Sequence, residues 1–449
     1  MMSIQDAATM VQGKASGGNP TFTGVSTDTR TVRAGELFVA LRGERFDGHG
    51  FLDRAKQGGA VAAMVDRAFK DKAPMPAIVV DDTKLGLGAL AKGWRARFQP
   101  ALIAVTGSNG KTTVKEMLAA ILRQHFGDDA VLATSGNLNN DIGLPLTLLR
   151  LQARHRCCAI ELGMNHKGEI AYLAAIAAPT VALVNNAQRE HLEFMKSVEE
   201  VAAENASVYA ALPADGVAVV NADDAHADFF RKAAGKRRVV DFGIDKKALV
   251  SSRHVVQGLT SEIDIRTPAG EAHATLAIPG LHNVRNALAA AACAFAVGIK
   301  EKTIAEGLSA FRPYTGRLQV KTAIGGATVI DDTYNANPDS VRAAIDVLAA
   351  CPSPTVLVLG DMGEVGEQGE EFHREVGAYA RAKKISQLCA LGEASRHAAQ
   401  AFGAEGRHFD SVEALVAGVK GRSILVKGSR FMKMERVVAA LTGTTTGGH

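Results

Sequence analysis

ALIAVTGSNGKTTVKEMLAAILRQHF, residues 101–126, is the stretch that decides the fold of this chain. Its opening, ALIAVTG (101–107), is an apolar run typical of a buried strand, and residues 113–126 have the spacing of an amphipathic helix. In the connection, glycines let backbone N–H groups turn inward, the helix N-terminus adds positive charge, and lysine can reach terminal phosphates. The stretch predicts a phosphate-binding loop formed by Gly107, Ser108, Asn109, Gly110, Lys111, Thr112 and Thr113.

The loop departs from the usual pattern at one position. The common motif has a glycine five positions before Gly110, and Val105 stands there instead. The loop is therefore the shorter Gly-x-x-Gly-Lys-Thr that begins at Gly107. A glycine turn that only starts a helix is the alternative, but the strand–loop–helix context favours phosphate binding.

Two later segments supply candidate metal ligands. CCAIELG (157–163) is an apolar strand ending in Glu161, where a carboxylate commonly holds Mg²⁺ together with a hydroxyl such as that of Thr112. NNAQREHLEF (185–194) places His191 just past the next predicted strand, at the same edge of the sheet. The alternatives are a solvated glutamate at a strand end and a structural histidine.

The alternation of strand-like apolar runs and helical stretches along the chain indicates an α/β fold of three domains. Its 449 residues are too many for one ordinary core. Apolar runs separated by helical stretches predict a parallel sheet covered on both faces. Breaks near residue 100 and in FRPYTG (311–316) divide the chain into a small N-terminal α/β domain (1–98), a central P-loop ATPase domain (99–313) and a Rossmann-like C-terminal α/β domain (314–449).

Composition narrows the class of protein. The net charge of +4 is small and the basic residues are spread along the chain, which argues against nucleic acid as a partner. The five cysteines show no Cys-x-x-Cys spacing and are expected to be buried thiols. The N-terminal segment lacks the pattern of a signal peptide, and the longest apolar run is too short to span a bilayer, so we expect a cytoplasmic protein.

Ten segments carry a resemblance that covers nearly the whole chain. In chain order they are GVSTDTRTVRAGELFVALRGERFDGHGF (24–51), TGSNGKTTVKEM (106–117), SGNLNNDIGLPLTLL (135–149), IELGMNHKGEI (160–170), NNAQREHLE (185–193), GLHNVRNALAAA (280–291), YTGRLQV (314–320), DDTYNANPDS (331–340), LGDMGEVGE (359–367) and VKGSR (426–430). Together they resemble the Mur ligases, which build the peptide of the bacterial cell wall.

The resemblance implies ATP and Mg²⁺ as cofactors. The first domain would bind the UDP end of a nucleotide sugar, the second would bind ATP, and the third would close over the site. Lys111 would contact the β- and γ-phosphates, Thr112 and Glu161 would hold one Mg²⁺, and His191 would serve a second metal. The further ATP contacts implied are Asn283 at the adenine, with Arg317, Asp332, Asn335 and Asn337 from the third domain.

The resemblance also implies where the other substrates bind. The turn that contacts UDP would be formed by Ser26, Thr27, Asp28 and Arg30. The muramoyl-peptide end would face Asn137, Asn139, Asn140 and Asp141. The reacting peptide would face Lys427, Ser429 and Arg430, and the catalytic candidates are Lys111, His191 and Lys427. Taken alone, NLNND (137–141) could equally be a polar loop that caps a helix, and STDTR (26–30) an ordinary turn.

One position departs from the family. Many Mur ligases carry a carbamylated lysine that helps to bind the second Mg²⁺, and Asn205 stands where that lysine is expected. Asparagine cannot be carbamylated. Either Glu204 or another carboxylate compensates, or fewer protein groups hold the second metal.

The activity implied is the ATP-dependent ligation of D-alanyl-D-alanine to UDP-N-acetylmuramoyl-tripeptide, through an acyl phosphate, by an enzyme expected to be a monomer. One alternative is another amide ligase of this type, such as a third-residue ligase or a folylpolyglutamate synthase. The Asp-Asn-Pro-Arg motif of diaminopimelate-adding ligases is absent from the sequence. The other alternative is a P-loop nucleotide switch, and the sequence lacks the Asn-Lys-x-Asp motif that a GTPase would need.

Overall fold

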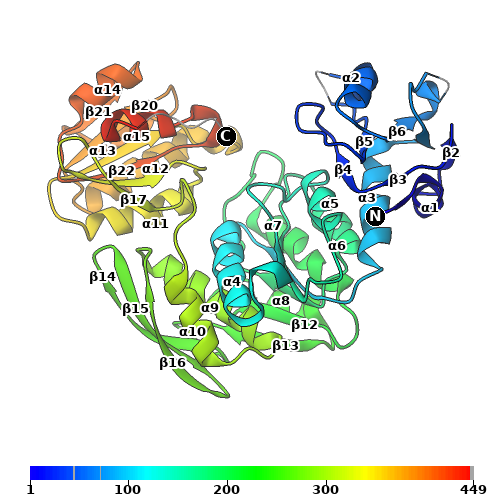
Figure 1. Ribbon diagram of the computed structural model, residues 1–449. Coiled ribbons are helices and arrows are strands. Elements are labelled where there is room, and N and C mark those ends of the chain that lie inside the picture. Colours follow the sequence, from blue (N-terminus) through cyan, green and yellow to red (C-terminus); the bar gives the residue numbers. More distant parts are fainter. Residues whose placement is uncertain (44–45, 71, 445–449) are drawn as a thin grey trace.

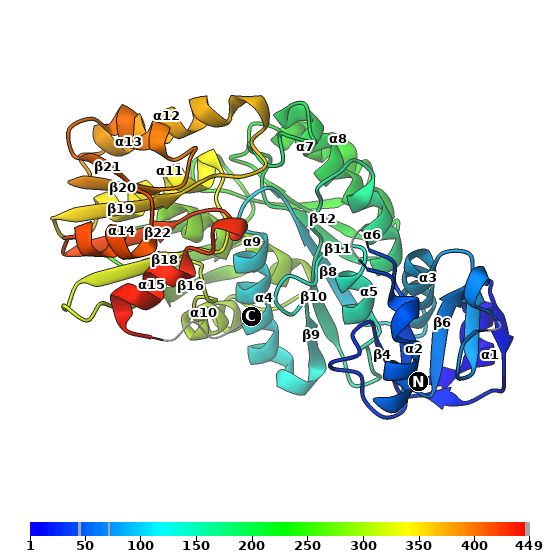
Figure 2. The same ribbon diagram turned by 90° about the horizontal axis from the view of Figure 1, so that it is seen from above.

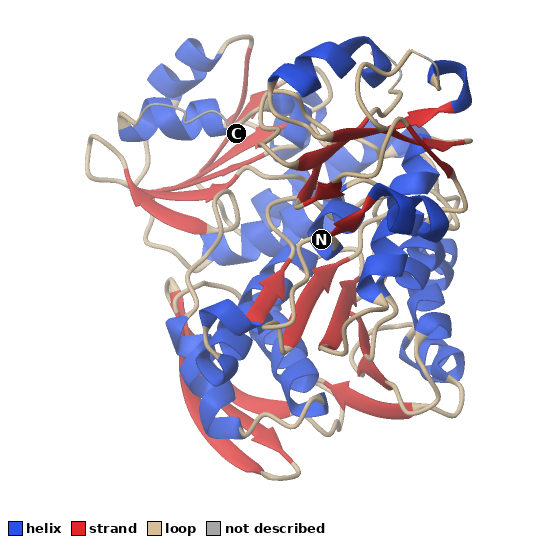
Figure 3. Cartoon of the chain, turned by 45° about the vertical axis from the view of Figure 1, so that its right-hand side comes forward, coloured by secondary structure: helices blue, strands red, loops and turns tan. Residues whose placement is uncertain are grey.

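The computed structural model describes residues 1–43, 46–70 and 72–444. The chain forms three α/β parts, with the central part between the N-terminal and C-terminal parts (Figure 1, Figure 2). Helices pack against the sheets, as the colouring by secondary structure shows (Figure 3). The three-domain α/β prediction is therefore confirmed. The predicted boundaries at 98/99 and 313/314 fall in the connections between α3 (Thr83–Arg95) and β8 (Ala101–Thr106) and between α10 (Glu301–Ala310) and β17 (Gln319–Thr322).

The N-terminal part is built on a five-stranded sheet of order β2-β7-β6-β5-β4. Its edge strand β2 is antiparallel to β7, and the other pairs are parallel. The strands are β1 (Met2–Ser3), β2 (Lys14–Ser16), β3 (Thr21–Phe22), β4 (Gly24–Ser26), β5 (Glu36–Val39), β6 (Ala62–Asp66) and β7 (Ala77–Val80), where β1 pairs with β3 separately. The helices are α1 (Ile4–Met10), α2 (Leu52–Gln57) and α3.

The central part has a six-stranded parallel sheet of order β13-β12-β11-β8-β10-β9. Besides β8, its strands are β9 (Val131–Ala133), β10 (Cys157–Glu161), β11 (Val181–Val184), β12 (Val217–Asn221) and β13 (Arg238–Phe242). Every residue of β10, β11 and β12 is buried, because helices cover both faces. The helices are α4 (Lys111–Phe126), α5 (Gly143–Leu148), α6 (Glu169–Ala177), α7 (Val198–Ala206), α8 (Ala227–Ala234), α9 (Leu281–Ala296) and α10.

A three-stranded antiparallel sheet is added to the central part beside α9 and α10 (Figure 1). It consists of β14 (Ser251–Gln257), β15 (Thr260–Thr267) and β16 (Gly270–Leu276). In β15, buried Ser261, Ile263 and Ile265 alternate with partly exposed residues, because only one face of this sheet is covered.

The C-terminal part has a six-stranded sheet of order β17-β18-β22-β19-β20-β21, parallel except for the edge strand β17. Its other strands are β18 (Thr328–Asp332), β19 (Thr355–Gly360), β20 (Gln387–Leu391), β21 (Gly406–Phe409) and β22 (Ser423–Lys427). The helices are α11 (Pro338–Ala349), α12 (Gly369–Ala382), α13 (Arg396–Phe402), α14 (Val412–Gly418) and α15 (Glu435–Thr442).

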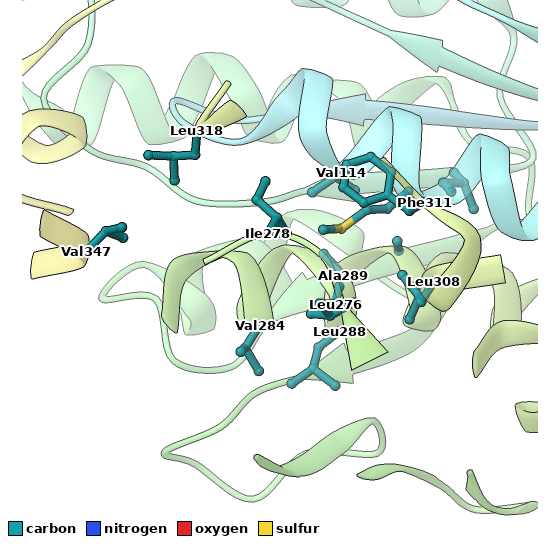
Figure 4. Close-up of a cluster of buried hydrophobic side chains, with 14 of the residues drawn as sticks. Val114, Leu276, Ile278, Val284, Leu288, Ala289, Leu308, Phe311, Leu318 and Val347 are labelled. Atoms are coloured by element: carbon teal, nitrogen blue, oxygen red, sulfur yellow. The ribbon is translucent and has the colours of Figure 1, made fainter. Parts of the chain in front are cut away.

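Apolar contacts join the three parts. Val347 of α11 lies in the same buried cluster as Ile278 and Val284 of the central part (Figure 4). On the other side, Trp94 of α3 donates a hydrogen bond to the carbonyl of Leu151 over 3.1 Å.

The five cysteines are buried free thiols, as predicted. No helix within the described ranges is long and apolar enough to cross a membrane.

Candidate active site

A cavity of about 810 Å³ lies where the three parts meet. Its wall combines Lys84 of α3 with the loop before α4, the loops after β9, β10 and β11, and the C-terminal part. The predicted residues that line it are Ser108, Asn109, Gly110, Lys111, Thr112, Asn137, Asn139, Asn140, Asp141, Glu161, His191, Arg317, Asn335, Asn337, Lys427 and Arg430.

Both glycines of the phosphate loop are required by its geometry. Gly107 has φ +131° and Gly110 has φ +83°, a region that L-residues rarely adopt. A Cβ atom on Gly110 would lie 2.4 Å from Asn286 Oδ1. Val105 is a fully buried residue of β8, so the loop turns only at Gly107 and needs no earlier glycine.

Lys111 turns back over this loop. Its ammonium donates hydrogen bonds to the carbonyls of Gly107 (2.6 Å) and Ser108 (3.0 Å). It also forms an ion pair with Glu190, whose Oε1 lies 2.8 Å from Lys111 Nζ. The positive charge is thus held beside the backbone N–H groups that would cradle a phosphate.

Glu161 and Thr112 form a set of oxygen ligands suited to Mg²⁺. Thr112 Oγ1 donates to Glu161 Oε1 over 3.2 Å, and Asn139 Nδ2 donates to the same oxygen over 2.8 Å. Glu161 Oε2 is buried and accepts no hydrogen bond from the residues that the structure describes. A buried carboxylate oxygen without a partner, next to a hydroxyl, fits a hard divalent cation. Among the same residues, no three His, Cys, Asp or Glu side chains already form a complete metal cage.

His191 lies between two carboxylates, with a left-handed φ of +52°. Its Nε2 is 3.4 Å from Glu190 Oε1, and its Nδ1 is 2.6 Å from Glu364 Oε2 of the C-terminal part. Burial works to lower the pKa of His191, but the contacts with Glu190 and Glu364 outweigh it and raise the pKa to about 9. The imidazole is therefore cationic at neutral pH in this arrangement.

Glu190 was not among the predicted site residues. Burial works to raise the pKa of its carboxyl group, but Lys111 and His191 hold that pKa below its ordinary value. The segment NNAQREHLEF contained a signal for it, because Glu190 directly precedes His191 at a strand end facing the phosphate loop.

The C-terminal part contributes a second set of polar groups. Arg317 Nη2 donates to Thr112 Oγ1 over 3.3 Å, and its guanidinium lies 4.0 Å from the ring centroid of Tyr334. Asn337 Nδ2 donates to Asn109 Oδ1 of the phosphate loop over 2.9 Å. These contacts bring the predicted third-domain residues directly onto the loop.

Lys427 lies deeper in the C-terminal part. Its Nζ is 2.5 Å from Asp332 Oδ2 and donates to the carbonyl of Asn335 over 2.9 Å. Burial lowers the pKa of Lys427, although Asp332 opposes the change. Lys427 reaches the cavity wall, whereas Asp332 lies behind it as the counterion.

Other predicted residues do not line the cavity. Within the described ranges, those that do not line it are Ser26, Thr27, Asp28, Arg30, Gly107, Thr113, Asn283, Asp332 and Ser429. Ser429 Oγ instead donates to the carbonyl of Ala336 over 3.1 Å and fixes the loop before α11. Asn283 Nδ2 donates to the carbonyl of Pro279 at the start of α9.

The asparagine loop combines both readings of its sequence. Asn140 Oδ1 accepts from the backbone N–H of Gly143 over 2.8 Å, so this side chain caps the start of α5. It also lines the cavity with Asn137, Asn139 and Asp141. Asp141 forms an ion pair with Lys84 of the N-terminal part, with 2.8 Å between Oδ2 and Nζ.

Asn205 and Glu204 are both engaged elsewhere. Asn205 is fully buried, and its Oδ1 accepts from Thr106 Oγ1 over 2.7 Å. The two oxygens of Glu204 accept from the backbone N–H groups of Gly168 and Ile170, both over 2.8 Å, at the start of α6. Glu204 therefore does not compensate for the missing lysine at the cavity.

Comparison with known proteins agrees with this geometry. Residues 21–95 match the model of the Mur ligase family catalytic domain, 105–294 that of the Mur ligase middle domain, and 316–430 that of the Mur ligase glutamate ligase domain. The UDP-N-acetylmuramoyl-tripeptide–D-alanyl-D-alanine ligase of Escherichia coli (strain K12) is 41% identical over 450 residues, with 98% of each chain covered.

Solved structures give the same result. A crystal structure of MurF from Acinetobacter baumannii superposes with a TM-score of 0.91 at 32% identity, with 98% of each chain covered. MurF ligase from Thermotoga maritima in complex with ADP gives a TM-score of 0.81 at 25% identity, covering 94% of this chain and 97% of that one. The cavity is lined by residues of all three α/β parts, and the chain is similar to these enzymes along its length, so the protein belongs to the Mur ligase family.

Proposed function

We propose that this enzyme joins D-alanyl-D-alanine to UDP-N-acetylmuramoyl-tripeptide and converts ATP to ADP and phosphate. The observation that carries the proposal is the cavity in which the phosphate loop meets residues of all three parts. It is supported by the activity for which the E. coli relative is named, since that enzyme is 41% identical with 98% of each chain covered. The product would be the UDP-linked pentapeptide of peptidoglycan synthesis, made in the cytoplasm.

The first step would transfer the γ-phosphoryl group of ATP to the tripeptide carboxylate. Two anions must approach each other, so the site needs fixed positive charge. Lys111 and Arg317 flank Thr112 at the loop and supply that charge from two different parts of the chain. Mg²⁺, when held by Thr112 and Glu161, would add charge neutralisation at the same phosphates.

The second step would be attack of the dipeptide amine on the acyl phosphate, with release of phosphate. Acyl phosphates hydrolyse readily, so water must be kept out. The hydrogen bond between Asn337 and Asn109 and the approach of Glu364 to His191 close the C-terminal part over the loop. Because His191 is held as a cation, it cannot accept the amine proton while both glutamates flank it.

Binding of the nucleotide sugar would use the N-terminal part. In the turn after β4, Asp28 accepts hydrogen bonds from Arg30 and lies beside Ser26. The turn does not line the cavity, so an elongated substrate would place UDP at this turn and its peptide end beside Asn137, Asn139, Asn140 and Asp141.

Release of inorganic phosphate by the purified enzyme tests the proposal. Release that requires ATP, UDP-N-acetylmuramoyl-tripeptide and D-alanyl-D-alanine together is expected. Turnover with a single amino acid, or with a folate acceptor, but none with the dipeptide would refute it in favour of a third-residue ligase or a folylpolyglutamate synthase. Lys111→Ala should abolish release, whereas Lys302→Ala, at an exposed position of α10, should not change it.

A further inference from the structure

Glu190 is a largely buried acid that lines the cavity, and neither of the two proposed reaction steps uses it. Its side chain is 11% exposed. Oε1 contacts Lys111 Nζ, whereas Oε2 is buried and accepts no hydrogen bond from any described residue. A carboxylate oxygen buried in this way is costly unless a cation or a donor reaches it.

The ion pair between Lys111 and Glu190 cannot persist when a nucleotide binds in the proposed way. The phosphates of ATP would compete for the ammonium of Lys111, which now lies 2.8 Å from Glu190 Oε1. Once Lys111 turned to the phosphates, Glu190 would keep only the imidazole of His191, 3.4 Å from its Oε1, as a cationic neighbour. The loss of the lysine leaves room for another cation at the carboxylate.

A small cavity beside Glu190 provides room for such a cation. It measures about 10 Å³, close to the space of a single water molecule, and lies between the central and C-terminal parts. Glu190, His191 and Glu364 line both this cavity and the main one. Glu190 and His191 Nε2 therefore lie beside a space of about one ion, whereas Glu364 contacts the other ring nitrogen of His191.

We propose that Glu190 exchanges Lys111 for a divalent cation when ATP binds, and that it is the carboxylate ligand of a second metal in this enzyme. Mg²⁺ in nucleotide sites is usually held by one or two carboxylates together with phosphates and water, rather than by a cage of protein atoms. The exchange keeps the charge balanced, because Lys111 pairs with phosphate while the metal pairs with Glu190. His191 Nε2 is the nearest nitrogen, 3.4 Å from Glu190 Oε1.

The position of Asn205 agrees with this assignment. Asn205 Oδ1 already accepts a hydrogen bond from Thr106 and is fully buried behind β8. Glu204 caps α6 with both of its oxygens. Unlike Glu204, Glu190 lines the cavity and retains an oxygen without a partner among the described residues.

Counting bound Mn²⁺ tests the proposal without relying on activity. The full-length enzyme is dialysed against Mn²⁺ and a non-hydrolysable ATP analogue, and bound metal is measured by electron paramagnetic resonance. About two Mn²⁺ per chain are expected for the unchanged enzyme and about one for Glu190→Gln. Glu190→Asp, which keeps a carboxylate, should retain the second Mn²⁺ with weaker affinity. Glu193→Gln is the matched control, because Glu193 is exposed nearby and should leave the count unchanged.

The outcomes separate this inference from the proposed function on which it rests. Two Mn²⁺ bound by Glu190→Gln, or one by the unchanged enzyme, would overturn the metal role of Glu190 and leave the ATP site intact. If the analogue did not bind to the unchanged enzyme, the proposed ATP site and this inference would both be wrong. Binding of the analogue by Glu190→Gln shows that the variant is folded.

Discussion

Replacing Arg189 with alanine should open the C-terminal part of the enzyme. Arg189 follows β11 in the central part, and its guanidinium lies 2.6 Å from Asp339 Oδ1 and 2.7 Å from Glu375 Oε2 of the C-terminal part. The hydrogen bonds that Arg189 donates to Glu375 and Asp339 raise the pKa of Arg189. This side chain therefore ties the two parts together through charge.

The free energy that the ion pairs of Arg189 contribute to the closed form lies between two limits. Exposed pairs contribute about 0–1 kcal/mol, and breaking a fully buried pair costs about 3–5 kcal/mol. The side chains here are 24%, 23% and 29% exposed. Arg342 stays paired with Glu375 over 2.8 Å, and the Arg189 backbone N–H stays on Asp339, so a cost of about 1–2 kcal/mol is expected. That changes the ratio of closed to open enzyme about 5–30-fold.

Small-angle scattering and steady-state kinetics check this prediction. Arg189→Ala should show a larger radius of gyration than the unchanged enzyme, and its KM for ATP should rise by up to the same factor. Arg342→Ala is the control, because it removes a contact to Glu375 within the C-terminal part without crossing to the central part. A scattering profile and KM for Arg189→Ala equal to those of the unchanged enzyme would refute the reasoning.

Three further predictions concern single side chains. Gly110→Ala should lower stability by about 2–5 kcal/mol, from its left-handed φ and the collision with Asn286, and should abolish nucleotide binding, as thermal unfolding and a titration would show. The pKa of His191 is raised on folding, so its protonated form stabilises the fold by on the order of 3 kcal/mol below pH about 6.5. This stabilisation is lost as the pH rises through about 9. Unfolding of nucleotide-free enzyme by urea between pH 6 and 10 should show this loss, and His191→Gln should remove it. Lys427→Met should cost about 3–5 kcal/mol because it leaves Asp332 buried and unpaired, and adding Asp332→Asn should restore part of that stability.

The phosphate loop could be predicted because its signals are local. The strand, the glycines and the first turn of α4 follow one another in sequence, and their roles need no distant partner. Glu161 could be placed for a similar reason, since parallel strands end at one edge of a sheet. The family resemblance then added Arg317 and Asn337, which no local pattern could bring onto the loop.

The misses have a common physical cause. Glu190 pairs with Lys111, 79 positions away, and its neighbour His191 pairs with Glu364, 173 positions from that histidine, so the environment of Glu190 is set by tertiary contacts. The contacts of Asn283 with adenine and of Ser429 with the peptide stay predictions; in the structure these side chains donate hydrogen bonds to the carbonyls of Pro279 and Ala336. The sheet β14–β16 was not predicted, because the alternation of apolar and polar residues in SEIDIRT (261–267) is a weaker signal than the continuous apolar runs of the parallel sheets.

The packing of α11 on the central part has a consequence for how the enzyme responds to its surroundings. Val347 lies so close to Gly280 that a Cβ atom there would come within 2.7 Å of its methyl group, and the buried cluster continues through Ile278. Opening the C-terminal part exposes this apolar surface, so it should carry a positive heat-capacity change, and cooling should weaken the contact. The ion pairs of Arg189 should instead weaken as the ionic strength rises. Cooling would therefore weaken the apolar contact of α11, and added salt would weaken the ion pairs of Arg189, on two different sides of the same closed site.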